Sequence, residues 1–246
     1  MPFDIKTLNK KFVATVALWI NDLIDVTFPN VCTVCHRRLV KGENVICLHC
    51  LSDLPRTNLH KYRPNKIHER LMAIGMPVEK ATSLFYYYRD SPYARLIHDT
   101  KYRNRPTVGR TLAMMHAQEL KESDFFDSID CIVPVPLHLL KQIKRGYNQA
   151  EEIARGINSV TSLPIINALS ASYHKTQTRK DSHQRLLNVK GVYNVAEVDA
   201  IQGKHILLID DVITTGATLL SCMQAIRQAS PSTRISVYSL SITQLG

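Results

Sequence analysis

The sequence has no apolar segment long enough to cross a lipid bilayer. A spanning helix needs about 20 mainly apolar residues, and the longest candidate, 12–28, is interrupted by Asn21, Asp22 and Asp25. No secretory signal is visible either. We therefore expect a cytoplasmic protein that is not an integral membrane protein. We expect residues 1–28 to form an amphipathic helix that packs on the protein, on a partner or on a membrane surface.

Acidic residues are scarce relative to basic ones. The chain has 31 Lys and Arg against 21 Asp and Glu, which gives a formal net charge of +10. From residue 191 onward three basic residues face four acidic ones, so the whole excess lies in the first 190 residues. This distribution favours a polyanionic partner, either a phosphorylated small molecule or a nucleic acid, although a solvated basic surface has the same composition. The apolar content of 45% excludes extensive disorder.

Cysteines are few, but four of them have the spacing of a metal site. Cys32 and Cys35 form one C-x-x-C pair, and Cys47 and Cys50 form a second pair after eleven intervening residues. Two such pairs can present four thiolates to Zn²⁺ in a tetrahedron. A disulfide framework is not expected in a chain without an export signal. We predict a closed, structural zinc site that stabilises a small module. The other two cysteines lie in apolar segments and are expected to pack in the core.

The most informative segment lies near the C-terminus. An apolar run at 206–209 is typical of a buried parallel strand, and Asp210 and Asp211 follow it directly. A small, hydroxyl-rich turn comes next and leads into a helix with one apolar face; the turn consists of Thr214, Thr215, Gly216, Ala217 and Thr218. Because open α/β sheets bind ligands at the carboxyl ends of their strands, we expect a site here.

The chemistry of this turn suits a sugar phosphate. The free N–H groups and partial positive charge of a helix N-terminus hold a phosphate, and Gly216 lets the backbone approach the ligand closely. The threonine hydroxyls add donors. Asp210 and Asp211 can accept hydrogen bonds from two neighbouring sugar hydroxyls. The alternative is an ordinary strand-to-helix loop with capping residues, which needs fewer polar groups than this segment has.

A second segment brings basic residues to the end of an expected strand. The strand at 129–135 leads into prolines, and Lys144 and Arg145 follow shortly before another amphipathic helix. A basic loop at a helix start is well placed to neutralise a pyrophosphate.

Two other polar segments are open to more than one interpretation. The stretch 174–185 has no apolar periodicity and carries Lys175, Arg179 and Arg185. We expect a mobile functional loop, with a solvated surface excursion as the alternative. The basic cluster 101–105 is either an ordinary helix terminus or part of an anion-binding rim.

Taken together, these segments resemble one family. The turn at 210–218, Asp-Asp-x-x-Thr-Thr-Gly-x-Thr, is similar to the phosphoribosyl-diphosphate (PRPP) signature of type I phosphoribosyltransferases. The further segments, in chain order, are the four-cysteine module, Lys-Tyr-Arg at 101–103, Pro-Val-Pro-Leu at 134–137, Arg-Gly-Tyr-Asn-Gln-Ala at 145–150, Lys-Thr-Gln-Thr at 175–178 and Arg-Leu-Leu-Asn at 185–188. This order resembles that of the ComF/GntX-like proteins over nearly the whole chain. Asn104 and Tyr147 are small departures from the family pattern.

The resemblance implies an α/β fold, with a type I phosphoribosyltransferase-like parallel sheet flanked by helices and a small N-terminal four-cysteine zinc module. Asp210 and Asp211 would hold the ribose 2′- and 3′-hydroxyls, and the turn at 214–218 would wrap the 5′-phosphate. The expected division is an N-terminal helix at 1–28, the zinc module at 29–60, a linker at 61–80 and the phosphoribosyltransferase-like domain at 81–246.

The resemblance also implies a bacterial cytoplasmic protein linked to uptake of single-stranded DNA during natural transformation. PRPP with Mg²⁺, single-stranded DNA and proteins of the uptake machinery are the implied partners. As an enzyme, the protein would displace pyrophosphate from C1 of the ribose, with Lys144 and Arg145 on the leaving group and the 175–185 loop closed over the site. No residue stands out as the general acid or base, so the acceptor is open. The alternative is a catalytically silent protein that responds to PRPP or a nucleotide and binds single-stranded DNA.

Overall fold

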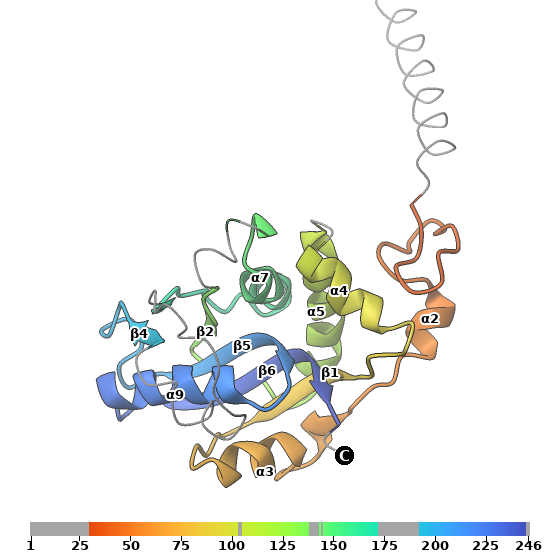
Figure 1. Cartoon of the computed structure of the whole chain (residues 1–246). Helices are drawn as coiled ribbons and strands as arrows, with labels where there is room; N and C mark the ends of the chain where they lie inside the picture. The colour runs from red at the N-terminus through yellow and green to blue at the C-terminus, as the bar shows by residue number, and fades with distance from the viewer. Residues whose placement is uncertain (1–29, 103–104, 138–142, 144, 172–191, 245–246) are drawn as a thin grey trace, which may run out of the picture. The chain divides into compact units, whose positions relative to one another are not determined.

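A computed structural model describes residues 30–102, 105–137, 143, 145–171 and 192–244 (Figure 1). The chain divides into two compact units, 1–53 and 54–246. The four cysteines lie in the first unit, which also contains the short helix α2 (Leu48–Ser52). Among the described residues, the helices are too short or too polar to cross a membrane. The helix expected at 1–28 lies outside the described residues.

The second unit is built on a parallel sheet of four strands in the order β1-β6-β5-β2. The strands are β1 (Ala81–Tyr87), β2 (Cys131–Pro134), β5 (His205–Ile213) and β6 (Arg234–Thr243). β2 and the first half of β5 are buried throughout, as expected for strands with helices on both faces. The strands predicted at 129–135 and 206–209 are therefore confirmed.

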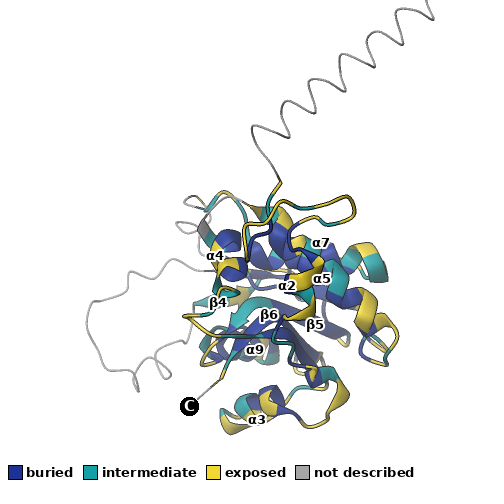
Figure 2. Ribbon diagram, turned by 90° about the vertical axis from the view of Figure 1, so that its right-hand side faces the viewer, coloured by how far each residue is buried: buried dark blue, intermediate teal, exposed yellow. Residues whose placement is uncertain are grey.

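Helices cover both faces of this sheet (Figures 1 and 2). On one face lie α4 (Ala94–Tyr102), α5 (Pro106–Lys121) and α7 (Gln149–Thr161), and on the other lie α3 (Lys66–Ala73) and α9 (Ala217–Ala229). Gly156 lets α7 approach α5 closely, because a Cβ at this position would collide with the backbone oxygen of Arg110. A 3-10 turn (Leu59–Lys61) and a two-stranded antiparallel sheet of β3 (Leu169–Ala171) and β4 (Tyr193–Val195) complete the unit.

The structure differs from the sequence expectation at the segment 61–80. We expected a linker, but this segment contains α3, whose Ile67 and Leu71 are fully buried. Asn65 caps α3 and its side-chain nitrogen also donates to the carbonyl oxygen of Ala81 at 2.8 Å. These contacts join the segment to β1, so the second unit begins at Leu54.

β5 also extends further than its apolar run. Its ladder with β6 continues through the pairs Asp210–Ser239 and Ile213–Ile242. Asp210 and Asp211 are therefore strand residues, held by the backbone hydrogen bonds of the sheet rather than by a loop.

The connections that leave β2 and β5 run in opposite directions across the sheet. From β2 the chain passes through α7 and returns at Ile165, which forms a parallel bridge with Ile132 on the edge away from β5. From β5 it passes through α9 to β6. Ligands of open α/β sheets bind at the carboxyl ends of the strands where the direction reverses. The topology therefore favours a site between the ends of β2 and β5.

Candidate functional site

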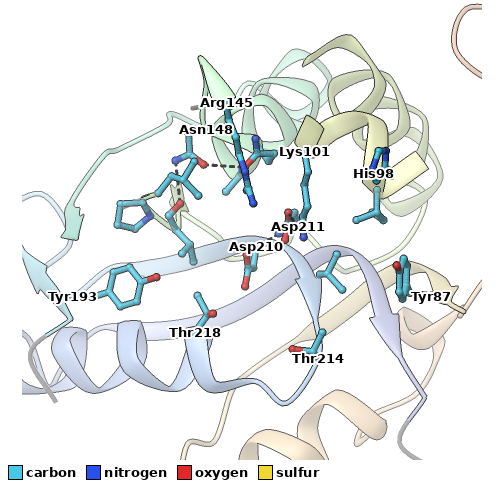
Figure 3. A pocket seen from close by; sticks show the side chains of 17 residues that line it. Tyr87, His98, Lys101, Arg145, Asn148, Tyr193, Asp210, Asp211, Thr214 and Thr218 are labelled. Atoms are coloured by element: carbon cyan, nitrogen blue, oxygen red, sulfur yellow. Dashed lines mark hydrogen bonds and ion pairs between the residues drawn. The ribbon is translucent and has the colours of Figure 1, made fainter. Parts of the chain in front are cut away.

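A cleft of about 430 Å³ lies at the carboxyl ends of β2 and β5 (Figure 3). This volume is within the usual range for small-molecule sites, roughly 300–1,000 Å³. Five parts of the fold contribute the polar side chains that line the cleft (Figure 3). Asp210, Asp211, Thr214 and Thr218 come from β5 and the turn after it, Arg145, Asn148 and Gln149 from the start of α7, His98 and Lys101 from α4, Tyr193 from β4 and Tyr87 from β1.

Two adjacent carboxylates lie at the centre of this cleft. Burial raises the pKa of Asp210 to about 7, and the neighbouring charge of Asp211 adds to the rise. The backbone N–H of Asp211, which donates to Oδ1 of Asp210 at 2.8 Å, and the ammonium group of Lys101 oppose this effect. The pair is therefore costly to hold in the ionised form, which is typical of functional sites.

Lys101 supplies the cation beside the acids. It lies in the last turn of α4, and its Nζ is 2.9 Å from Oδ2 of Asp211. Both side chains are largely buried, with 23% and 14% of their surface exposed. Of the two interpretations of the 101–105 cluster, the helix terminus holds for Lys101, which lies in the last turn of α4. Lys101 also lines the cleft, and its part in an anion-binding rim stays a prediction.

The turn after β5 has the backbone of an anion site. Gly216 has φ of +83°, in the left-handed region that favours glycine, and it forms the N-cap of α9. The first N–H groups of α9 lack partners within the helix, although the N–H of Ala217 lies 3.4 Å from Oγ1 of Thr215. The apolar face predicted for this helix is confirmed, because Leu219, Cys222, Met223 and Ile226 are all fully buried.

The start of α7 presents a second helix N-terminus to the cleft. Oδ1 of Asn148 accepts from the N–H of Ala150 at 3.0 Å, and Nδ2 donates to the carbonyl oxygen of Val135, also at 3.0 Å. Asn148 thereby caps the helix and ties it to the segment after β2. Nη1 of Arg145 donates to Oε1 of Gln149 at 2.8 Å, which holds its guanidinium at the edge of the cleft.

The predicted site residues divide into two groups. The structure brings Asp210, Asp211, Thr214, Thr218 and Arg145 to one cleft, with Thr215, Gly216 and Ala217 in the same turn. Lys144 and the loop residues Lys175, Arg179 and Arg185 lie outside the described residues, so their roles stay predictions.

Sequence reasoning did not single out His98, Asn148 or Tyr193. Asn148 had a usable signal, since it directly precedes an amphipathic helix and asparagine is a favoured N-cap. Tyr193 and His98 had none. The ring of Tyr193 faces the acid pair (Figure 3), and burial, with the charges of Cys222 and Asp210, raises the pKa of its hydroxyl. Tyr87, at the end of β1, also lines the cleft.

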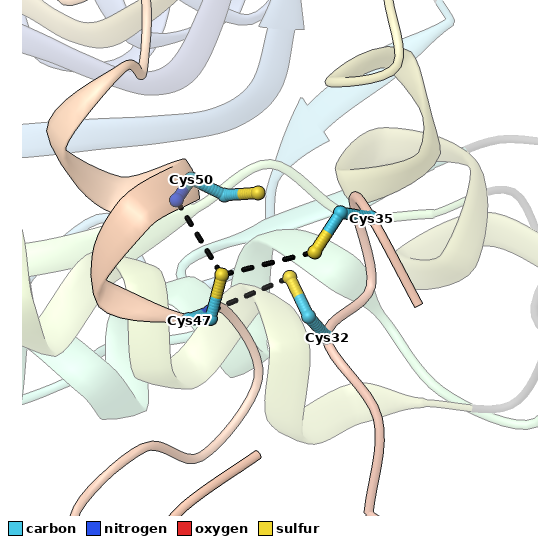
Figure 4. A group of neighbouring side chains, drawn as sticks. All are labelled: Cys32, Cys35, Cys47 and Cys50. Atoms are coloured by element: carbon cyan, nitrogen blue, oxygen red, sulfur yellow. Dashed lines mark hydrogen bonds between the residues drawn. The ribbon is translucent and has the colours of Figure 1, made fainter. Parts of the chain in front are cut away.

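In the first unit, the four predicted cysteines form one cluster (Figure 4). The Sγ atoms of Cys32, Cys35, Cys47 and Cys50 all lie within 4.8 Å of one another. Zn–S bonds of about 2.3 Å in a tetrahedron put sulfurs about 3.8 Å apart. The distance between Sγ of Cys35 and Sγ of Cys47 is 3.8 Å. The cluster can therefore hold a zinc ion.

The backbone around this cluster favours the thiolate form of Cys32, whereas burial raises the pKa of the Cys50 thiol. Burial opposes ionisation of Cys32, but N–H donors from Cys35, Cys47 and Val34 together lower its pKa to about 7. Glu43 stabilises the loop that joins the two cysteine pairs, because its carboxylate accepts from the N–H groups of Val40 and Leu48 at 2.9 and 2.8 Å. The predicted core role of the two other cysteines is confirmed, since Cys131 and Cys222 are fully buried.

Comparisons with known proteins give the following similarities. The sequence pattern of the phosphoribosyl transferase domain family matches residues 106–241. Competence protein F of Haemophilus influenzae is 26% identical over 208 residues, which cover 80% of this chain and 84% of that protein. DNA utilization protein YhgH of Salmonella typhimurium is 25% identical over 222 residues, 85% of this chain and 95% of that protein. Competence protein ComFC of Bacillus subtilis is 29% identical over 109 residues, 44% and 43% of the two chains.

Proposed function

Because the chain belongs to the phosphoribosyl transferase family, as a protein of the ComF type, we propose that its cleft binds PRPP together with Mg²⁺. One observation carries this proposal: the carboxylate pair Asp210–Asp211 and the turn at 214–218 line the same cleft. Carboxylates are poor partners for a phosphate but good acceptors for sugar hydroxyls. A helix N-terminus, by contrast, binds a phosphate well because its N–H groups are free donors. A phosphorylated ribose satisfies both.

The proposed binding mode follows from these preferences. The 5′-phosphate lies on the N–H groups and hydroxyls of the turn, and the ribose hydroxyls donate to Asp210 and Asp211. The pyrophosphate extends toward the start of α7, where Arg145 offsets its charge; Lys144, which lies outside the described residues, is predicted to contribute to the same role. Mg²⁺ bound to PRPP would neutralise part of the phosphate charge. Lys175, Arg179 and Arg185 would cover the bound ligand and exclude water.

The proposed reaction is transfer of the phosphoribosyl group. The bond between C1 of the ribose and the pyrophosphate oxygen breaks, and a bond from C1 to a nucleophilic acceptor forms as the acceptor loses its proton. Positive charge develops on the sugar near the carboxylates, and negative charge develops on the leaving group near Arg145. Catalysis would rest mainly on positioning and electrostatics. Pyrophosphate release across a panel of bases and nucleic acids would identify the acceptor.

Calorimetry with Mg²⁺–PRPP tests the binding. We expect the Asp210→Asn/Asp211→Asn double variant to lose at least tenfold in affinity, since two charged acceptors are replaced. Asp124→Asn is the matched control, because that carboxylate pairs with Arg63 at 2.9 Å and is 63% exposed, away from the cleft. Absence of binding by the wild-type protein at millimolar ligand would refute the proposal.

We also propose a role in DNA uptake or use, as the names of the relatives suggest for those proteins. Direct binding of single-stranded DNA is the second candidate function, and the net charge of +10 favours it. Such binding should weaken steeply with salt, because contacts to the phosphate backbone release counterions. A labelled oligonucleotide titrated at 50 and 200 mM salt tests this candidate, and tight binding that is insensitive to salt would contradict it.

The cysteine cluster is assigned a structural rather than a catalytic role. Four protein ligands complete the tetrahedral shell of Zn²⁺ and leave no position for a substrate. We propose that Cys32, Cys35, Cys47 and Cys50 hold this ion and that it stabilises the first unit.

A further inference from the structure

Arg70 contacts the turn of the cleft from the side of α3. Its Nη1 lies 2.5 Å from the carbonyl oxygen of Thr214 and 3.4 Å from that of Ile213, and its Nη2 donates to the carbonyl oxygen of Thr243 at 2.9 Å. One guanidinium therefore joins the end of β5, the turn and the end of β6. Its Nε is buried and has no hydrogen-bond partner among the described residues. The guanidinium therefore donates to these carbonyl oxygens, while the N–H of its Nε is left without a partner in the part of the chain that the structure describes.

These contacts fix the direction of two peptide groups. A trans peptide is planar, and its N–H points opposite to its C=O. Because the carbonyls of Ile213 and Thr214 point toward Arg70, the N–H groups of Thr214 and Thr215 point away from it. Those two donors belong to the turn that lines the cleft. Arg70 therefore acts on the donors of the turn without lying in the cleft itself.

α3 is a firm base for this contact. The Asn65 side chain accepts from the N–H of Ile67 at 3.0 Å and donates to Leu59 and Ala81, each at 2.8 Å. Leu71, the next residue after Arg70, packs beneath the turn, because a Cβ on Gly216 would lie 3.6 Å from its Cδ2. The helix, the guanidinium and the turn therefore form one packed unit.

We infer that Arg70 is a positioning residue that holds the Thr214 and Thr215 N–H groups toward the 5′-phosphate of a bound phosphoribosyl ligand. The inference rests on the proposed function for the identity of the ligand. Arginine suits this role because its planar fork reaches several carbonyls at once and keeps its charge when partly buried. The charge also adds a favourable potential beneath the phosphate.

Two fragments of PRPP test this role separately. Ribose 5-phosphate depends on the turn, and pyrophosphate, on the proposed binding mode, depends on the start of α7. Calorimetry with each fragment is done on wild-type protein, Arg70→Met, Arg70→Lys and the control Arg56→Met. Arg56 is a suitable control because it is a partly buried arginine that pairs with Glu119 rather than with the cleft.

We expect Arg70→Met to lower the affinity for ribose 5-phosphate roughly tenfold. The affinity for pyrophosphate should stay within about twofold of the wild-type value. Arg70→Lys should lie between, since an ammonium group reaches fewer carbonyls than the fork does. The control should bind both fragments as the wild type does. If both fragments weaken equally, or if neither changes in Arg70→Met and Arg70→Lys, the inference is overturned. Should Arg70→Met fail to fold, Arg70→Lys alone decides, and its unchanged ribose 5-phosphate affinity counts against the inference.

Amide hydrogen exchange of the ligand-free protein separates this inference from the proposed function. Loss of Arg70 should speed exchange of the Thr214 and Thr215 amides while the amides of α7 keep their rates. If the wild-type protein binds neither PRPP nor ribose 5-phosphate, yet loss of Arg70 speeds exchange at these two amides, the proposed ligand is refuted and the positioning of the turn is retained. Unchanged exchange at both amides overturns the positioning role itself.

Discussion

Replacement of Asp210 by asparagine should stabilise the protein at high pH while it weakens binding of the proposed ligand. The pKa of Asp210 is raised from its ordinary value of 3.8 to about 7 by burial and by the charge of Asp211. An acid whose pKa is higher in the folded state holds more protons there than in the unfolded state. The free energy of unfolding therefore falls as the pH rises from about 4 to 7, and above pH 7 the full loss is present.

The size of the effect follows from the shift. The full shift corresponds to about 4 kcal/mol, of which about 2.6 kcal/mol accrues between pH 5 and pH 8 by linkage. Asp210 faces a cleft that water enters, so we expect roughly half of that, about 1 kcal/mol, to be realised. Asparagine removes the charge but keeps an oxygen that can accept from the N–H of Asp211.

Urea unfolding of wild type and Asp210→Asn at pH 5, 6, 7 and 8 measures this effect. The difference in unfolding free energy, variant minus wild type, should become more positive by about 1 kcal/mol from pH 5 to pH 8. Asp124→Asn is the matched control, since it removes an exposed carboxylate that lies away from the cleft. A difference that does not change with pH, or that becomes more negative, would refute the raised pKa of Asp210. A gain in stability with loss of PRPP affinity is the trade-off expected of a binding residue.

Three other substitutions test neighbouring features. Lys101→Met should increase the fall in stability between pH 5 and pH 8 by roughly 1 kcal/mol, because its charge lowers the pKa of Asp210; the same urea series measures it, and an unchanged fall contradicts it. Gly216→Ala should lower the free energy of unfolding by roughly 1 kcal/mol because φ is +83°, and it should also lower the affinity for ribose 5-phosphate in calorimetry. Gly203→Ala is the control: its φ of +70° imposes a similar backbone strain in open space, so it should lower stability without changing that affinity. Cys47→Ser should remove the roughly one zinc ion per chain expected from elemental analysis; full zinc content in this variant would exclude the four-cysteine site, and Cys222→Ser should retain the metal.

The parts of the structure that the sequence predicted are those whose signals are local. The strand at 206–209, the acid pair and the helix after it stand within about twenty residues, and each has its own chemistry. The cysteine pairs likewise reveal themselves by spacing. The segment 61–80 was misjudged because Pro64 and several polar residues suggest a linker, whereas its helix is stabilised by burial of Ile67 and Leu71 against elements distant in sequence.

The contacts that complete the cleft are distant in the chain, and this is why the sequence did not reveal them. Lys101 reaches Asp211 across 110 positions, and Arg70 reaches Thr243 across 173. No periodicity or spacing encodes such pairs, because they depend on the strand order β1-β6-β5-β2, which brings α3 and α4 to the end of β5. The order itself could be expected only through the family resemblance. Residues that bind a ligand directly are therefore visible as a motif, while residues that hold the motif in place emerge only from the fold.

Because the acid pair depends on residues distant in the chain, its stability depends on the rest of the fold. Two adjacent carboxylates in a half-buried strand repel each other, and the local segment offers only the Asp211 N–H to offset that repulsion. The remaining offset comes from Lys101, on a different element. A site of this kind is stable only when the whole sheet and the helices above it have formed. The turn of residues 214–218 has the same dependence, because its peptide orientation requires Arg70 from α3. We therefore expect an isolated peptide of residues 205–229 to bind ribose 5-phosphate far more weakly than the intact protein, even though it contains the complete signature.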